Sequence, residues 1–483
     1  MLRTSFTRLL LLLSLLLGLL GLSACSTLTE LRQDFSDKVF GREPPNPPAE
    51  LVEIQPTHNA RIDWSSNTGK TDKYDYTPAL DSTAIYSANV KGEITKLDSA
   101  NGRQLWQINI GEPISGGVGT GAGIVLVGSS KGHVFAYDVS GKLVWKAKLS
   151  SEVLSVPRYF EGIVIVRSGD NRIYGLDATD GSRKWVYERI NPALTLRSSV
   201  GVVVDSGAVY AGFAGGKMVA IRADNGKLIW EATVAQPRGV TEIERIADIT
   251  SLPVVDGPLV YAVAYQGKVA AVDRATGRVV WNRDISSYSG LSAEDAKVFV
   301  SHTLGAVYSL DYSSGKTFWR QGALSNRRLT APLPMGNVIA VGDLEGYLHF
   351  LTREEGKFAA RIKLDSNPVM SLITGTKSNQ LIAETRDGGI YAISVTESNV
   401  KPTVAPASKP EPEARPDPSS ETAPVQQPSA PEPAAEPASQ PSSERSILFQ
   451  KNDSILLPDM EAAPTPNTEN SAPGIRLPNP EQQ

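Results

Sequence analysis

The chain has 483 residues and only one cysteine, Cys25. A single cysteine excludes an internal disulfide and any Cys-x-x-Cys redox or metal motif. The four histidines, His58, His133, His302 and His349, are scattered over the sequence without the spacing of metal ligands. We therefore expect no metal site, and we interpret the histidines as strand-packing or surface residues.

Neither sign of charge predominates over most of the chain. The formal net charge is −4, and residues 401–483 alone hold 6 basic and 12 acidic residues. Apart from that stretch and two arginines near the N-terminus, Arg3 and Arg8, acidic and basic residues are equal in number. Such a balance gives no electrostatic footprint for nucleic acid or for an anionic bilayer surface.

Long hydrophobic runs are also missing, except for the leucine-rich stretch from Leu9 to Leu22. Arg3 and Arg8 precede this stretch, and small residues follow it. It is short for a membrane span, so the pattern predicts a secretory signal peptide over residues 1–24.

The sequence Leu22-Ser23-Ala24-Cys25 resembles the lipobox of bacterial lipoproteins. The resemblance implies that the signal is removed and that Cys25 is lipidated, with more than one acyl chain giving stable anchoring. Ser26 follows where lipoproteins of the inner membrane often carry Asp. By the same resemblance, the destination is the outer membrane, with the protein facing the periplasm.

Proline is unevenly distributed and marks the limits of the folded part. Of the 33 prolines, 18 fall in residues 401–483, mixed with Ala, Glu, Ser and Gln. This composition cannot bury enough apolar area to offset its ordering entropy, so we expect a disordered tail over residues 398–483. We expect residues 25–60, which include the proline-rich segment Glu43–Pro48, to be a tether, and residues 61–397 to be the folded domain.

The sequence does contain a repeat built around tryptophan. Six of the seven tryptophans close one phrase, an Asp in most copies, then Gly, three residues and Trp. Short alternating apolar runs in repeats of about forty residues are typical of the blades of a β-propeller, an all-β fold. The phrases end at Trp106, Trp145, Trp185, Trp230, Trp281 and Trp319.

Two further copies are incomplete and together predict an eight-bladed ring. A seventh copy has Ala360 where Trp is expected, and Phe358 is a candidate to fill the gap. The eighth is split between the hairpin segment Gly388–Ile393 and the N-terminal Trp64, which has no hairpin before it. Joining the N-terminal strand to the last blade would remove two free sheet edges, so we expect this strand to close the ring.

Catalytic signals are weak. Gly117–Ala122 loosely fits a dinucleotide loop but precedes a strand, and Asp177–Gly181 lacks the final Glu of a calcium loop. The repeat resembles that of pyrroloquinoline quinone dehydrogenases, which hold their quinone with a vicinal cysteine disulfide. A second cysteine is absent here. We therefore expect no cofactor, no catalytic residues and no enzyme activity.

Two connections between repeats are longer than the others. From each Trp position to the start of the next hairpin the chain usually spends 24 to 28 residues, but Trp185 to Gly216 takes 31 and Trp230 to Gly267 takes 37. Both connections run from an outer strand to the next inner strand, so they should emerge side by side on one face. Long loops on a rigid scaffold are usually binding elements.

These two loops, with the lipobox and the Trp repeats, closely resemble the BamB family, lipoproteins of the outer-membrane β-barrel assembly (BAM) machinery. The resemblance covers the chain from the signal to about residue 397. Its most specific segments are Asn191–Arg197 and Gln236–Thr250. It implies a non-enzymatic scaffold that aids insertion of β-barrel proteins, with other BAM subunits and unfolded outer-membrane proteins as further partners.

The family resemblance also implies particular docking residues. Leu194, Leu196, Arg197 and Asp248 match positions through which the family binds the periplasmic POTRA domains of BamA. A second acidic position of the family pattern is Thr250 here, which leaves the leucines and the arginine as the main expected anchors. Because Leu194 and Leu196 alternate, an extended loop would present both on one side, and Arg197 could pair with a partner carboxylate. We expect Asp248 near a solvated rim.

Alternatives remain open at this stage. The leucines could fold back over the blade edge while Arg197 pairs with Asp248 inside the chain. A periplasmic propeller could instead bind a cell-wall or polysaccharide ligand through aromatic side chains on its central face. A quinoprotein-like enzyme would need a cofactor or convergent catalytic groups.

Overall fold

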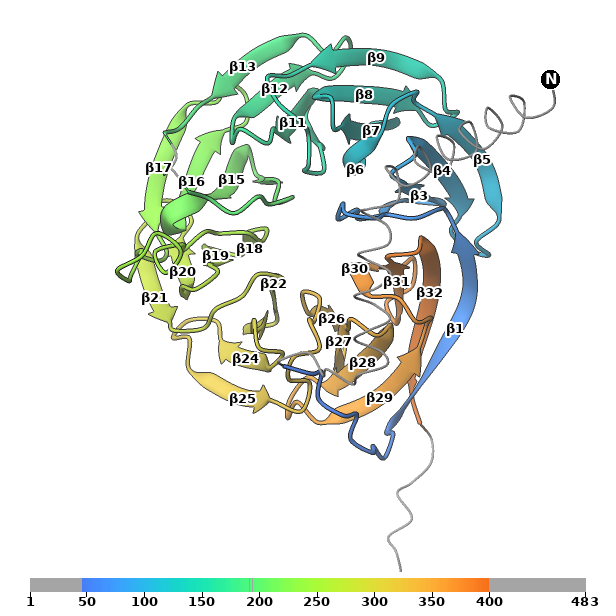
Figure 1. Cartoon of the computed structure of the whole chain (residues 1–483), viewed down its shortest axis with the longest axis vertical. Coiled ribbons are helices and arrows are strands. Elements are labelled where there is room, and N and C mark those ends of the chain that lie inside the picture. Colours follow the sequence, from blue (N-terminus) through green and yellow to red (C-terminus); the bar gives the residue numbers. More distant parts are fainter. Residues whose placement is uncertain (1–45, 191, 193, 399–483) are drawn as a thin grey trace, which may run out of the picture. The chain divides into compact units, whose positions relative to one another are not determined.

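The computed structural model describes residues 46–190, 192 and 194–398. The strands of this part form eight four-stranded antiparallel sheets arranged like blades around a central axis (Figure 1). The only helical element within it is the 3-10 turn η1, Ala214–Gly216. The expected all-β, eight-bladed propeller is confirmed. Cys25, the signal peptide, residues 26–45 of the tether and the segment after residue 398 lie outside the described residues.

Each blade runs from an inner strand near the axis to an outer strand at the rim. In that order, blade 1 is β2 (Ala79–Asp81), β3 (Ala84–Ala88), β4 (Glu93–Asp98), β5 (Gln104–Asn109); blade 2 is β6 (Ile114–Gly121), β7 (Ile124–Ser129), β8 (His133–Asp138), β9 (Leu143–Lys148); blade 3 is β10 (Arg158–Phe160), β11 (Ile163–Arg167), β12 (Ile173–Asp177), β13 (Arg183–Tyr187); and blade 4 is β14 (Val203–Asp205), β15 (Ala208–Phe213), β16 (Lys217–Arg222), β17 (Leu228–Thr233). Blade 5 is β18 (Val254–Asp256), β19 (Leu259–Val263), β20 (Val269–Asp273), β21 (Val279–Arg283); blade 6 is β22 (Gly290–Glu294), β23 (Lys297–Ser301), β24 (Val307–Asp311), β25 (Thr317–Gln321); blade 7 is β26 (Leu333–Met335), β27 (Val338–Gly342), β28 (Tyr347–Thr352), β29 (Phe358–Lys363); and blade 8 is β30 (Val369–Thr374), β31 (Gln380–Thr385), β32 (Gly389–Glu397), β1 (His58–Asn67).

The core lies between neighbouring blades rather than inside any one sheet. Second strands such as β19 are buried along their whole length because both faces of the sheet pack on another blade. Outer strands such as β9 bury the tryptophan and expose the residues on either side of it. One apolar cluster, for example, joins Tyr261 and Trp281 of blade 5 to Leu291 and Val298 of blade 6.

The tryptophan phrase locks each blade to the next. Trp145 of blade 2 donates its Nε1 hydrogen to the carbonyl of Ala178 in the β12–β13 turn of blade 3, at 2.8 Å. Gly181 of the same turn has φ +74°, and a Cβ there would lie 2.6 Å from the Trp145 ring, so only glycine lets the indole approach. The same bond, 2.8 to 3.1 Å long, recurs from Trp64 to Ser99, Trp106 to Val139, Trp185 to Ala223, Trp230 to Arg274, Trp281 to Tyr312 and Trp319 to Arg353.

The N-terminal strand closes the ring as predicted. β1 pairs antiparallel with β32 and forms the outer strand of blade 8, with Trp64 opposite Ala392. This brings a segment before residue 70 and a segment after residue 385 into one sheet. The closure removes the free edge that each segment would otherwise expose.

The seam between blades 7 and 8 lacks a tryptophan for a structural reason. Blade 8 has no hairpin between its third and outer strands, since these come from opposite ends of the chain. A tryptophan at position 360 would therefore find no turn to dock on, and Ala360 packs in the cluster of blades 7 and 8. The expectation that Phe358 fills this gap is wrong. A bulge in the β28–β29 pairing turns Phe358 toward the other cluster, beside Trp319.

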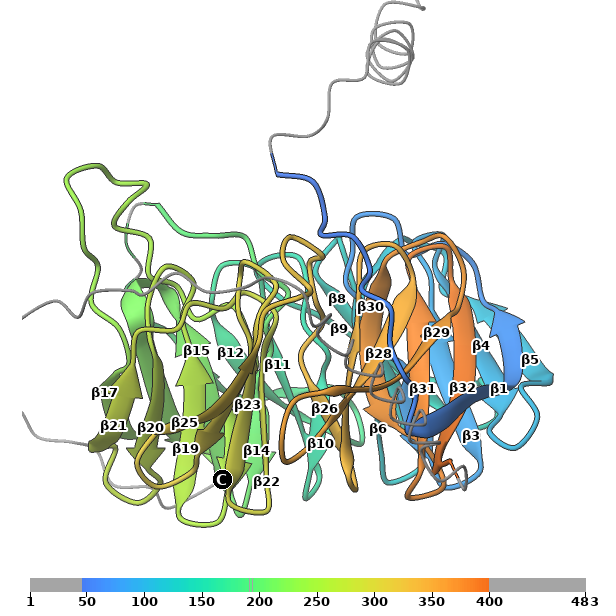
Figure 2. The ribbon, with the colours of Figure 1, turned by 90° about the horizontal axis from the view of Figure 1, so that it is seen from below.

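The two faces of the ring differ in their connections. All connections from an outer strand to the next inner strand emerge on one face, and among the described residues the longest are 188–202 and 234–253. Figure 2 shows these green segments rising above the ring on the same side. The prediction of two long loops flanking blade 4 is confirmed, and this face is called the loop face below.

Candidate docking surface

The first loop, residues 188–202, presents leucine side chains to solvent. Leu194 is 44% exposed and Leu196 is 36% exposed. This exposure does not agree with the alternative in which both leucines fold back over the blade edge. Partly exposed leucines on one loop are suitable apolar anchors for a protein partner.

Asp248 holds the first loop in position. Its side chain is only 4% exposed and accepts hydrogen bonds from the backbone N–H of Leu196, at 2.7 Å, and of Gly215 in η1, at 3.0 Å. The expectation that Asp248 lies near a solvated rim is wrong, because two backbone donors from different segments draw the carboxylate inward. The second loop, residues 234–253, thus ties the first loop to blade 4.

Arg197 is held by a residue that the sequence did not single out. Its guanidinium makes a two-pronged ion pair with Glu152, with Nε and Nη2 at 3.0 and 2.7 Å from the two carboxylate oxygens. The hydrogen bond with Glu152 raises the pKa of Arg197. The alternative pairing of Arg197 with Asp248 is wrong. Glu152 belongs to the β9–β10 connection, and no sequence pattern links it to a loop 45 residues away.

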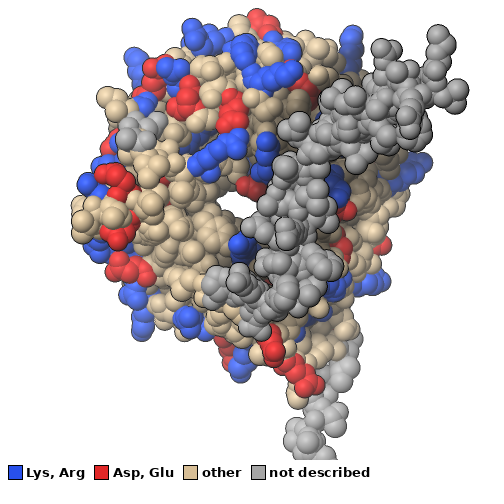
Figure 3. Space-filling view, viewed as in Figure 1, with Lys and Arg blue, Asp and Glu red and all other residues tan. Residues whose placement is uncertain are grey.

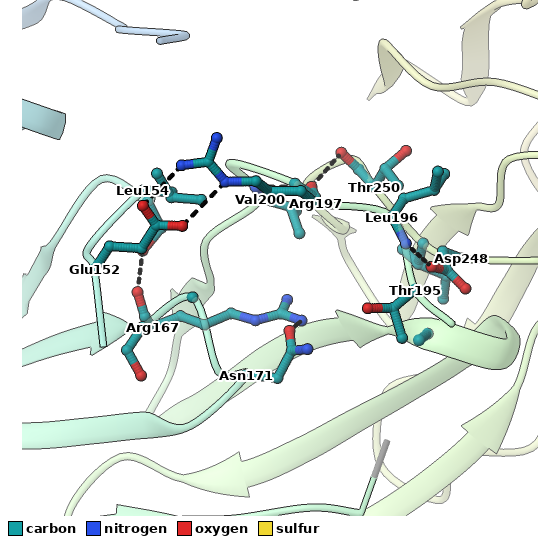
Figure 4. A pocket seen from close by; sticks show the side chains of 16 residues that line it. Glu152, Leu154, Arg167, Asn171, Thr195, Leu196, Arg197, Val200, Asp248 and Thr250 are labelled. Carbon is teal, nitrogen blue, oxygen red and sulfur yellow. Dashed lines mark hydrogen bonds and ion pairs between the residues drawn. The ribbon is translucent and has the colours of Figure 1, made fainter. Parts of the chain in front are cut away.

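A small polar pocket lies beneath these residues (Figure 4). Its volume is about 200 Å³. Arg167, at the end of β11, reaches into its lining, stacks on Phe213 with 4.6 Å to the ring centre, and donates to the carbonyl of Gly212 at 2.6 Å. Burial lowers the pKa of Arg167 to about 10, against the opposing effect of the Asp248 carboxylate. The remaining lining includes Glu152, Asn171, Thr195, Leu196, Arg197, Asp248 and Thr250.

Over the part of the loop face that is left uncovered in Figure 3, charged side chains do not form a patch of one sign. In the space-filling view down the axis, basic and acidic groups alternate around the rim (Figure 3). This agrees with the balanced charge expected for the folded part. Apolar side chains on the two long loops therefore distinguish this region better than charge does.

Thr250 stands at the second acidic position of the family pattern, and its contacts differ from those expected of a carboxylate that binds a partner. Its backbone oxygen accepts a hydrogen bond from the Ser198 hydroxyl at 3.4 Å, which adds a second tie between the two loops. Its own hydroxyl is buried without a hydrogen-bond partner among the described residues. Leu194, Leu196, Arg197, Asp248 and Thr250 thus come together in one region, with Asp248 and Thr250 more deeply buried than the first three.

The tip of the second loop adds apolar surface that the sequence analysis did not single out. Val240 is 96% exposed and Ile243 is 67% exposed, while Ile190 in the first loop is 95% exposed. The tip is fixed by reciprocal bonds, in which Glu244 accepts from the Val240 N–H at 2.8 Å and Thr241 accepts from the Glu244 N–H at 3.2 Å. A Thr-x-x-Glu phrase is a known helix-start signal and could have indicated this turn.

Other features of the described part offer little chemistry. It contains no cluster of three or more His, Cys, Asp or Glu residues suited to a metal ion. No helix in it is both long and apolar enough to cross a bilayer. His133 and His349 each contact a carboxylate inside the ring, Glu112 at 3.0 Å and Asp343 at 2.9 Å, in agreement with a packing role.

Comparison of the sequence with known proteins gives consistent matches. A family model described as "Outer membrane protein assembly factor BamB" matches residues 90–321. The protein of that name from Nitrosomonas eutropha is 38% identical over 381 residues, which cover 78% of this chain and 93% of the relative. The protein of that name from Bordetella pertussis is 35% identical over 379 residues, with 78% and 95% covered.

Comparison of the structure gives the same family and a wider group that shares the fold. The crystal structure of BamB from Moraxella catarrhalis superposes with a TM-score of 0.64 at 27% identity, covering 70% of this chain and all of that one. Quinohemoprotein alcohol dehydrogenase from Comamonas testosteroni superposes with a TM-score of 0.58 at 14% identity, covering 69% of this chain and 76% of that one. The second likeness shows the propeller fold alone.

Proposed function

The chain belongs to the family of outer membrane protein assembly factor BamB, and on that basis we propose that it docks on the POTRA domains of BamA through its two long loops. It is an assembly factor of the outer membrane and a scaffold rather than an enzyme. The proposed docking holds the propeller beside the POTRA domains, where it would aid insertion of β-barrel proteins. Other BAM subunits and unfolded outer-membrane proteins are further proposed partners.

The observation that supports the docking site is the exposure of apolar side chains on a rigid base. Leu194, Leu196, Val240 and Ile243 project from two loops that are bonded to each other and to blade 4. Exposed apolar groups clustered on one face commonly mark a protein interface. Because these bonds already hold Leu196 and Ser198 against the second loop, docking would lose little conformational entropy at these residues.

The residues have different proposed roles. Leu194 and Leu196 would enter apolar recesses of the partner, and Arg197 would exchange Glu152 for a carboxylate of the partner. An exposed ion pair contributes little to stability, so this exchange costs little. Asp248, being buried, would act by holding Leu196 rather than by touching the partner.

The proposed location follows from the resemblance of the N-terminus to a lipoprotein signal. Cys25 would carry the lipid and anchor the protein in the outer membrane on its periplasmic side. Cys25→Ala should give a folded protein that is released in a detergent-free wash. Retention of this variant in the detergent-requiring fraction at the native level would exclude the lipid anchor.

The docking proposal is tested by pull-down with purified POTRA domains. Changing Leu194, Leu196 and Arg197 to Ala together should abolish binding, because truncated anchors at an interface typically cost about 2 kcal/mol or more each. Circular dichroism checks that the ring is intact. Unchanged binding by the folded triple variant would refute the site.

A matched control uses residues of the same kind elsewhere on the ring. Leu143 and Val144 on β9 are 47% and 45% exposed, and the Arg222 side chain is 57% exposed, as is that of Arg197. Arg222 also pairs with a carboxylate, that of Asp224. Changing Leu143, Val144 and Arg222 to Ala should leave the pull-down at the native level.

A further inference from the structure

Residues 47–57, called the strap below, cross the outer edge of blade 7 before the chain enters β1. The strap contacts the ring mainly through its carbonyl groups. Two of its residues, Pro47 and Pro48, have no N–H to donate. Three ring side chains bind these carbonyls. The donors are Asn326 Nδ2 to Pro47 O at 3.2 Å, Arg327 Nη1 to Ala49 O at 2.7 Å and Arg361 Nη1 to Val52 O at 2.9 Å.

Two backbone bonds hold the ends of the strap. The Ala49 N–H donates to the carbonyl of Ser325 at 2.9 Å, and the Thr57 N–H donates to the carbonyl of Ala359 at 2.9 Å. The Thr57 carbonyl in turn accepts from the N–H of Ser398. The strap therefore also bridges blades 7 and 8, at the seam that has no tryptophan lock.

The arginines that bind the strap belong to a buried network of charges. Arg327 is 2% exposed and donates to Asp343 at 2.7 Å and to Glu345. Asp343 is fully buried and also contacts His349 Nε2 at 2.9 Å, while Arg361 Nε donates to His349 Nδ1 at 3.1 Å. Buried charges are costly unless they are paired and hydrogen-bonded. Arg327 and Arg361 thus link this buried network to the strap, because each also donates a hydrogen bond to a strap carbonyl.

The strap carries the chain from one face of the ring to the other. Ser325 and Asn326 lie in the connection between β25 and β26, which emerges on the loop face. Ala359 lies near the start of β29, at the opposite face. Figure 2 shows the blue N-terminal segment leaving the ring on the same side as the green loops. If the strap were not bound, the chain would leave the ring at His58, the first residue of β1, on the face opposite the loop face.

We propose that Arg327 and Arg361 are positioning residues for membrane attachment, which fix the strap so that the lipid-bearing end of the chain leaves from the loop face. The proposal rests on the proposed function, because it takes Cys25 as the lipid site and the loops as the docking site. Its consequence is that the loop face is turned toward the bilayer when the protein is anchored.

The place where the chain leaves the ring depends strongly on whether the strap is bound. The ten residues of β1 span about 33 Å, so losing the strap would move the exit by about that distance. Without the strap, residues 47–57 would also join the segment between Cys25 and the ring, which would lengthen it from 22 to 33 residues. The attachment point would thus lie at the opposite face and at the end of a longer segment, so the loop face would no longer be the face held toward the bilayer.

The orientation can be measured on the lipidated full-length protein in vesicles of phosphatidylethanolamine and phosphatidylglycerol. Cys25 is the only cysteine, so an introduced cysteine is the only free thiol once the lipid is attached. A fluorophore is placed at Glu242→Cys on the loop face or at Lys142→Cys in the β8–β9 turn on the opposite face; both positions are exposed. Quenching by a nitroxide on lipid headgroups reports which face is nearer the membrane.

We expect at least twofold stronger quenching at position 242 than at position 142 in the native background. Two independent changes should remove this difference. Arg327→Met removes a donor to the strap, whereas Ala49→Pro with Thr57→Pro removes two backbone donors and leaves the buried network intact. Arg222→Met, an exposed arginine outside the strap, should keep the difference.

Amide hydrogen exchange over residues 47–57 should accelerate at least tenfold in both strap variants. Equal quenching at the two positions in the native background would overturn the proposal, as would a persisting difference in the proline variant. Failure of the lipid anchor shows separately, because the native protein would then not sediment with vesicles. Failure of the docking site also shows separately, since the proline variant should pull down POTRA domains in solution as well as the native protein.

Discussion

The Ser87 hydroxyl on β3 donates a hydrogen bond to the Glu384 carboxyl group on β31, at 3.2 Å, across the seam between blades 1 and 8. Glu384 is fully buried, and the Ser371 hydroxyl is a second donor to it at 3.5 Å. Burial raises the pKa of Glu384 to about 8, although the two serine hydroxyls oppose the shift. A carboxyl group therefore keeps its proton at the seam that closes the ring.

This relationship predicts a pH dependence of stability. Between the ordinary pKa of 4.5 and about 8, the unfolded chain releases a proton from Glu384 that the folded ring retains. The free energy of unfolding should therefore fall as the pH rises through this range. Glu384→Gln should remove this component and make the ring more stable than the native protein at pH 9. Urea unfolding at pH 5, 7 and 9 measures the free energy of unfolding of the native protein and of the Glu384→Gln variant. If the two free energies changed with pH in parallel, the prediction would be contradicted.

Glu112 differs from Glu384 because its pKa is lowered rather than raised in the folded protein. Burial would raise its pKa, but hydrogen bonds from Lys146, His133 and Ser129 outweigh burial and hold the pKa at about 2. Its stabilising contribution is therefore present above pH 4.5 and is lost as the pH falls toward 2. Glu112→Gln should lower the free energy of unfolding at pH 7 and change it least at the acidic end. A variant as stable as the native protein at pH 7 would refute this.

The tryptophan lock predicts different effects for two glycines with the same backbone preference. Gly181 has φ +74° and touches Trp145, whereas Gly162 has φ +80° and a Cβ added there would meet no atom within 4 Å. Gly162→Ala should cost about 1 kcal/mol from backbone strain alone. Gly181→Ala should cost about 1–3 kcal/mol more, because the indole must move. Equal losses of stability in denaturant unfolding would show that the close contact is unimportant.

The buried position of Asp248 predicts an indirect effect on docking. Asp248→Ala removes the acceptor of the Leu196 and Gly215 N–H groups and a counter-charge of Arg167. We expect faster amide exchange at Leu196 and weaker binding of POTRA domains, while Asp248→Asn, which keeps an acceptor oxygen, should weaken binding less. Calorimetric titration gives the affinities. Weaker binding without faster exchange at Leu196 would instead favour direct contact by Asp248.

The ion pair of Arg197 predicts that its partner competes with docking. Glu152→Gln removes the negative charge that Arg197 contacts at 2.7 Å in the free protein. Exposed ion pairs contribute about 0.2–1 kcal/mol, so binding of POTRA domains should strengthen by up to about fivefold. Asp224→Asn in the β16–β17 turn, which removes the partner of Arg222, is the matched control. Weaker binding by Glu152→Gln would show that Glu152 instead orients Arg197 for the partner.

Much of the architecture was predictable because it is periodic. The spacing of Trp106 to Trp319 gives the blades, and the unpaired Trp64 gives the closing strand, since each blade repeats one local pattern of turn and strand. The lengths of the two connections around blade 4 also located the loops. These features depend on residues close together in the sequence, where turn chemistry and alternation act directly.

The tertiary structure decided what those residues contact. Burial of Asp248 and the pairing of Arg197 with Glu152 both depend on partners that are distant in the sequence. The strap is a still longer-range case, because Ala49 is held by Arg327 from the connection between blades 6 and 7. Closing the ring pairs β1 with β32, which are more than 300 residues apart, so contacts across this seam have no local signal in the sequence.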